Sequence, residues 1–126
     1  MNNSVSSGTL MHGVDVDGHI HYDFTVRLPV VKDTIDALRL TDEHYGTTEG
    51  AAANMYYKVA VMSCAMTALG TVPKDDITPE LLLNNLSDDD FDLVDAQIEA
   101  IKKKRMSLNP KSADTDSPSS PSENMG

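Results

Sequence analysis

The chain has 126 residues, 40% of them hydrophobic, which is enough for one domain with a modest core and too few for two. Twenty acidic residues against ten basic ones give a net charge of -10, which argues against nucleic acid as a partner. The single cysteine, Cys64, excludes an internal disulfide, and the first residues lack the basic and apolar stretches of a secretory signal, so we expect a cytoplasmic protein.

The first part of the chain predicts an antiparallel β-hairpin. Residues 1–8 are rich in Ser and Asn and lack periodicity, so we expect a disordered leader. From Thr9 a strand-like pattern leads into Asp17-Gly18, a strong hairpin turn signal, and residues 19–28 return with alternating apolar and polar side chains. One face of this sheet should therefore be apolar and should need a helix packed against it.

A short helix and a loop should follow the hairpin. Val31, Ile35 and Leu38 recur at helical spacing and predict a helix that ends near Leu40. Residues 41–50 are polar, contain two glycines and predict a connecting loop.

The stretch from Ala51 to Leu69 should form the central helix. It carries one formal charge, Lys58, and a helix that is apolar on nearly all sides is normally buried. Its alanines and polar residues make it too weakly hydrophobic for a membrane span, so we expect no membrane role. Met55, Met62 and Met66 could also give this helix adaptable contacts to a partner.

Two helices should close the domain. Thr78 and Pro79 predict the start of a short helix, and Ser87 predicts the N-cap of a longer helix with acidic residues in its first turn and basic residues at 102–105. An apolar stripe on the longer helix should lie along the central helix and, with the three methionines, form the candidate partner-binding residues: Phe91, Val94, Ile98 and Ile101. Residues 108–126 are rich in Pro, Ser and Asp and predict a disordered tail.

These elements predict an α+β fold: a small N-terminal antiparallel hairpin or sheet packed on three to four helices, in a single domain over residues 9–107. A lone hairpin is marginally stable in water, so a homo-oligomer is also plausible, through strand addition or through the Ala- and Met-rich helix.

No pattern in the sequence predicts catalysis, a cofactor or a metal. His19 and His21 share one face of a strand, but only their spacing favours a metal site, and no further ligand motif completes it. Asp15 and Asp17 match only part of a calcium loop, and the hairpin turn explains them. Cys64 lies within the apolar helix, without a base identifiable from spacing, which indicates a buried small side chain.

The order of several short motifs between residues 14 and 105 resembles a known family. The motifs are the Asp17-Gly18 turn, the strand closing in Val26-Arg27-Leu28-Pro29 with Asp33 after it, the Ala-rich middle helix, and Leu86-Ser87-x-x-Asp90-Phe91. Together they resemble the tail assembly chaperones of tailed bacteriophages, the phage Mu-like small tail assembly proteins.

The resemblance implies a non-catalytic protein that binds the phage tape measure protein, keeps it soluble in the host cytoplasm, assists the tail tube protein and is absent from the mature virion. Many such genes also make a longer product by ribosomal frameshifting, which we would expect near Lys102–Lys104.

Two alternatives remain open. The first is a minor structural protein of the phage tail. The second is an acidic inhibitor or antitoxin-like binder of a basic protein, supported by nine carboxylates and no Lys or Arg over residues 75–99.

Overall fold

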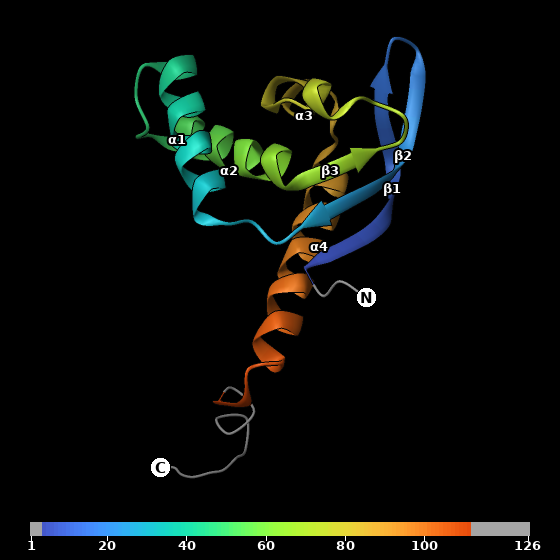
Figure 1. The fold of residues 1–126 in the computed structure, drawn as a ribbon. Coiled ribbons are helices and arrows are strands. Elements are labelled where there is room, and N and C mark those ends of the chain that lie inside the picture. Colours follow the sequence, from blue (N-terminus) through green and yellow to red (C-terminus); the bar gives the residue numbers. More distant parts are fainter. Residues whose placement is uncertain (1–3, 112–126) are drawn as a thin grey trace.

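The computed structural model describes residues 4–111 and shows an α+β fold, as the sequence predicts. Its elements, in chain order, are β1 (Val5–Val16), β2 (His19–Arg27), α1 (Val31–Tyr45), α2 (Ala51–Ala65), β3 (Met66–Leu69), the short 3-10 helix η1 (Lys74–Asp76), α3 (Pro79–Asn85) and α4 (Asp88–Ser107). The strands form one antiparallel sheet in the order β1-β2-β3, with α1 and α2 on one side and α4 running across it (Figure 1). Within residues 4–111, no helix has both the length and the apolar character to cross a bilayer.

The hairpin turn forms where the sequence predicts it. Asp17 and Gly18 both have positive φ angles, 54° and 80°, as the tight turn between two twisted strands requires. The start of β1 corrects the predicted leader, because residues from Val5 onward pair with β2, while residues 1–3 lie outside the described part of the chain. Cross-strand pairing outweighs the Ser-rich composition here, and the hydroxyls of Ser7 and Thr25 hydrogen-bond across the strands at 2.8 Å.

A wide bulge interrupts the pairing of β1 with β2. The register shifts between Thr9 and Val14, so several backbone N–H groups of β1 lose their partners on β2. The carboxylate of Asp90, which is fully buried in the first turn of α4, replaces those partners. It accepts hydrogen bonds from the backbone N–H groups of Met11 at 2.7 Å, His12 at 2.9 Å and Gly13 at 3.0 Å.

This arrangement keeps Asp90 ionised. Burial alone would raise the pKa of Asp90, but the three N–H donors outweigh burial and hold its pKa below the ordinary value. The N-cap that the sequence predicts also forms, because the Ser87 hydroxyl accepts from the Asp90 N–H at 3.1 Å. Asp90 therefore joins the start of α4 to a strand far away in the sequence.

Helix α4 packs on the sheet and not along the central helix as the sequence suggested. Val94, Ile98 and Ile101 are buried in one core cluster with Phe24 and Val26 of β2, and although Met62 of α2 joins this cluster, the close contacts of α4 are mainly with β1 and β2. The apolar face of the hairpin has to be buried against another element, and the apolar stripe of α4 fits it. Helix α4 therefore packs mainly against the sheet.

The central helix is shorter than predicted. It ends at Ala65, and the remaining residues, Met66–Leu69, form β3 at the edge of the sheet. The Lys74 ammonium donates to the carbonyl oxygens of Ser63 at 2.9 Å and Met66 at 2.7 Å, where a helix C-terminus favours a cation. A short apolar segment does not distinguish helix from strand, so the sequence alone did not reveal this change.

Helix α1 is longer than predicted, because it continues past Leu40 to Tyr45. Gly46 ends it with a φ angle of 74°, and its N–H donates to the carbonyl of Asp42. The short helix after Thr78 is confirmed: the Thr78 hydroxyl accepts from the Leu81 N–H at 3.1 Å.

Replacing Asp90 with Asn should lower the free energy of unfolding by about 3 kcal/mol. An amide has only one acceptor oxygen, and its NH2 group would face backbone N–H groups of β1 that now donate to the carboxylate. The lower pKa of Asp90 in the folded state means that its stabilising effect is complete above about pH 4 and is lost as the pH falls through the folded value. Urea titrations followed by circular dichroism should therefore show that the difference in the free energy of unfolding between wild type and Asp90→Asn becomes smaller in acid.

The matched control is Asp92→Asn, an exposed carboxylate in the same helix, which should change stability by less than about 0.5 kcal/mol. Equal losses for the two variants would refute the role given to Asp90.

Candidate partner-binding surface

Helix α1 turns its large apolar side chains toward solvent. Val31 is 75% exposed, Ile35 is 60% exposed and Leu38 is 42% exposed. The fully buried residues of α1 are instead small or polar, namely Asp33, Ala37 and Thr41, with Leu40 half-buried beside them. Contiguous exposed apolar side chains often mark an interaction site, so this face is the candidate partner-binding surface.

An ion pair fixes which face of α1 is buried. The two Arg27 guanidinium nitrogens donate to the two oxygens of Asp33 at 2.7 and 2.8 Å, and the backbone N–H of Val30 donates to the same carboxylate at 2.8 Å. Arg27 also donates to the carbonyl of Cys64 at the end of α2, at 2.9 Å. One guanidinium thus joins β2, α1 and α2.

The same contacts shift the ionisation of this pair. The Arg27 hydrogen bonds lower the pKa of Asp33 and outweigh the opposing effect of burial, and the Val30 N–H lowers it further. Asp33 therefore stays charged at neutral pH although its side chain is almost fully buried.

Small side chains let α1 lie close to α2. Ala37 of α1 is fully buried in a cluster with Ala60 and Tyr56 of α2. The Thr41 hydroxyl, also buried, donates to the carbonyl of Ala37 at 2.7 Å, so it needs no partner on α2. Leu40 of α1 packs half-buried against this cluster, while Val31, Ile35 and Leu38 lie on the outer side of the helix.

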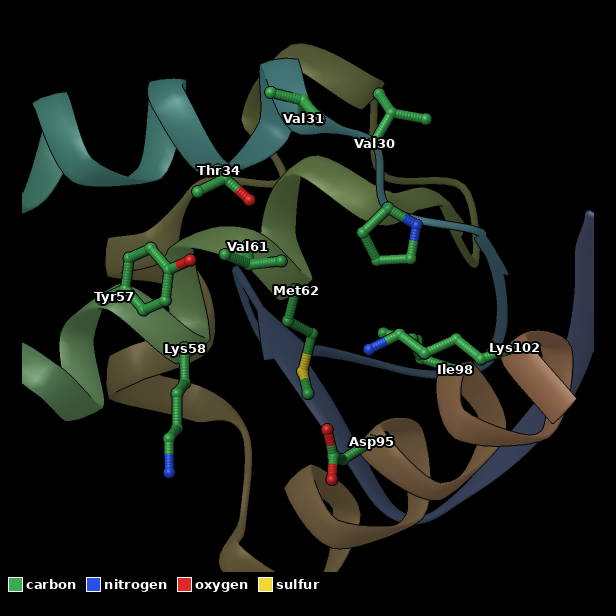
Figure 2. Close-up of a pocket in the computed structure, with 11 residues that line it drawn as sticks. Val30, Val31, Thr34, Tyr57, Lys58, Val61, Met62, Asp95, Ile98 and Lys102 are labelled. Atoms are coloured by element: carbon green, nitrogen blue, oxygen red, sulfur yellow. The ribbon is translucent and has the colours of Figure 1, made fainter.

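An open cavity of about 420 Å³ adjoins the exposed face of α1. Figure 2 shows side chains of α1, α2, α4 and the loop before α1 around it, with Lys58, Asp95 and Lys102 among them. The lining residues are Pro29, Val30, Val31, Thr34, Tyr57, Lys58, Val61, Met62, Asp95, Ile98 and Lys102. A cavity of this size with mainly apolar walls can take one or two large apolar side chains of a partner.

Most of the residues predicted to bind a partner lie elsewhere. Five of the seven are buried in the core, so as exposed contact residues that prediction is wrong for Met62, Met66, Val94, Ile98 and Ile101. They are buried because the sheet and the central helix need their apolar surface, although Met62 and Ile98 also reach the cavity wall. Met55, which is exposed, and Phe91, which is half-buried, line a separate hollow of about 200 Å³.

The sequence contains a signal for the exposed apolar residues of α1. The spacing of Val31, Ile35 and Leu38 predicted a helix with one apolar face, but it did not say whether that face would be covered.

The residues weighed for metal binding or nucleophilic chemistry do not form a site. Within residues 4–111, no three His, Cys, Asp or Glu side chains come together as a metal ion would need. The rings of His19 and His21 lie 5.5 Å apart, and Nδ1 of His21 accepts from the Thr71 N–H at 3.4 Å. Burial, with Asp33 nearby, raises the pKa of the Cys64 thiol and keeps it protonated.

Comparison with known proteins adds no identity. No family model matches this chain, and neither the curated proteins nor the solved structures contain a match.

Replacing Arg27 with Lys should lower the free energy of unfolding by about 1–2 kcal/mol, because an ammonium cannot form the paired bonds to Asp33 and also reach the carbonyl of Cys64. Hydrogen exchange should show faster exchange in the first turn of α1. The control is Arg39→Lys, since Arg39 forms only an exposed ion pair with Glu43. Unchanged exchange in α1 would show that the ion pair does not hold this helix.

Proposed function

We propose that this protein is a non-catalytic tail assembly chaperone of a tailed bacteriophage. It would bind the tape measure protein in the host cytoplasm, keep it soluble while the tail tube protein assembles around it, and leave before the virion is complete. The motif order between residues 14 and 105 supports this family, and the uncovered apolar face of α1 is the structural observation that carries the proposal.

An exposed apolar face gives up stability that the chain could have gained. Full burial of one Val, Leu or Ile side chain is worth about 1.5–3 kcal/mol, and three such residues on α1 are between 42% and 75% exposed. A long helix-rich client exposes apolar stripes of its own before it is assembled. Mutual cover would remove both surfaces from water, which is what a chaperone for such a client has to achieve.

The charge of the chain fits the same role. Each bound copy would bring a net charge of -10, so coated clients would repel one another and resist aggregation. A surface made of one helix face and one cavity is small, which favours weak and reversible contact at each site. Many copies along a long client would still hold it firmly until assembly displaces them.

Two residues that carry the family resemblance have a physical role at this surface. Arg27 and Asp33 form the ion pair that orients α1, and so they determine that its apolar face stays outside. The motif thus supports the proposal through the position of α1 and not through chemistry of its own.

Co-expression with the tape measure protein of the same phage genome tests the proposal. Wild type should move the client into the soluble fraction, and Ile35→Asp should lose most of that gain because it puts a charge at the centre of the surface. The matched control is Ile20→Asp, because Ile20 is the same residue type, is 48% exposed and lies on the hairpin away from α1. Circular dichroism should confirm that both variants fold.

A client that stays insoluble with wild type would refute the chaperone role, and equal activity of the two variants would place the contact away from α1. Mass spectrometry of purified particles should find none of this protein. A fixed copy number there would instead identify a minor structural protein of the tail.

A further inference from the structure

The exposed residues of α1 have the spacing of a coiled-coil seam. Val31, Ile35, Leu38 and Tyr45 are all at least two-fifths exposed. Their spacing corresponds to d, a, d and d positions of a heptad repeat, with Asp42 at the remaining a position. The seam runs over the two heptads of α1, a length of about 22 Å at 1.5 Å per residue.

The surface also has a defined end. The cavity of about 420 Å³ is lined by Val31, the first seam residue, and by Val61 and Met62 of α2. A helix lying along the seam would bring one of its own side chains over this cavity. A polar residue at an a position, here Asp42, is known to restrict the register of such a pair.

Four of the ten Lys and Arg side chains lie beside the seam or at the cavity, together with the carboxylates of Asp36, Glu43 and Asp95. Only five Lys or Arg residues precede residue 102, against seventeen carboxylates. Arg27 and Lys74 are bound within the fold, to Asp33 and to backbone carbonyls. The other three lie at the surface: Lys32 and Arg39 at e positions beside the seam, and Lys58 at the cavity, where Lys102 joins it.

These cations can accept a partner's carboxylates. Lys32 pairs with Asp36 at 2.9 Å and Arg39 pairs with Glu43 at 3.1 Å, both in exposed positions. Exposed pairs of this kind are worth about 0–1 kcal/mol, so a partner's acidic side chains can compete for the cations at little cost.

The same charges disfavour an antiparallel pairing with a second copy of this chain. An antiparallel pairing of two α1 helices would set the e positions of each against the e positions of the other, so Lys32 and Arg39 would face like charges. The net charge of -10 on each copy would add to the repulsion.

We propose that the α1 seam and its cavity bind a single α-helix of another protein, with apolar residues at a and d positions and acidic residues beside them. The inference rests on the proposed function in one respect: the client would supply this helix. It deepens that function by naming the class of segment that the surface takes.

Two labelled peptides of three heptads test this site with the full-length protein. Both have Leu at a and d except for one Lys at an a position, and they differ only in having Glu or Lys at the e and g positions. Fluorescence anisotropy should show about tenfold tighter binding of the Glu peptide, and the difference should shrink in high salt. The double variant Lys32→Glu/Arg39→Glu should reverse the preference.

The two isoleucine variants test whether peptide binding depends on the α1 seam or on exposed apolar residues elsewhere. Ile35→Asp should abolish binding of the Glu peptide, while Ile20→Asp should bind it like wild type. Equal affinity for the two peptides, or unchanged binding by Ile35→Asp, would overturn the proposal. So would sedimentation that shows a dimer lost only in Ile35→Asp, because the seam would then belong to a second copy.

The outcome is separable from that of the chaperone test. Selective binding of the Glu peptide without any effect on client solubility would leave the helix site standing and refute the client. Rescue of the client without peptide selectivity would leave the chaperone role standing and overturn the helix site.

Discussion

The Arg27 guanidinium is the contact on which the arrangement of this domain depends. It lies at the end of β2 and binds both oxygens of Asp33 in α1 and the carbonyl of Cys64 at the end of α2. Three elements therefore meet at one planar group whose donors have fixed directions. Because Asp33 is held inward, the opposite face of α1 points outward, so a partly buried ion pair determines which side chains are left for a partner.

Asp33 in α1 and Asp90 in α4 play the same structural role. Each is the third residue of a helix, is almost fully buried, and has a lowered pKa because hydrogen-bond donors surround its carboxylate. The sequence predicted acidic residues in the first turn of the last helix, which favour the helix dipole. It could not predict that Asp90 would accept from β1, since the strand residues are 77 to 79 positions away and only the bulge leaves their N–H groups unpaired.

Local signals explain the parts that the sequence predicted well. The Asp17-Gly18 turn and the Thr78 and Ser87 caps depend on neighbouring residues, and all three form as predicted. The fold class followed from them and from the alternating hairpin. The predictions that were wrong depend on competition between distant elements: Met66–Leu69 becomes a strand because β2 offers an edge, and the stripe of α4 is buried because the sheet needs a cover.

The partner-binding residues show why such competition is hard to read from one sequence. Large apolar side chains at helical spacing look alike whether they will be buried or exposed, so the sequence predicts a contact surface at the stripe with Val94 and only a helix at Ile35. What distinguishes them is the other face of each helix. In α1 that face carries Ala37 and the paired Asp33, which pack closely and leave the apolar side outside. In α4 the opposite face is highly charged and could not be buried at all, so the apolar side had to go inward.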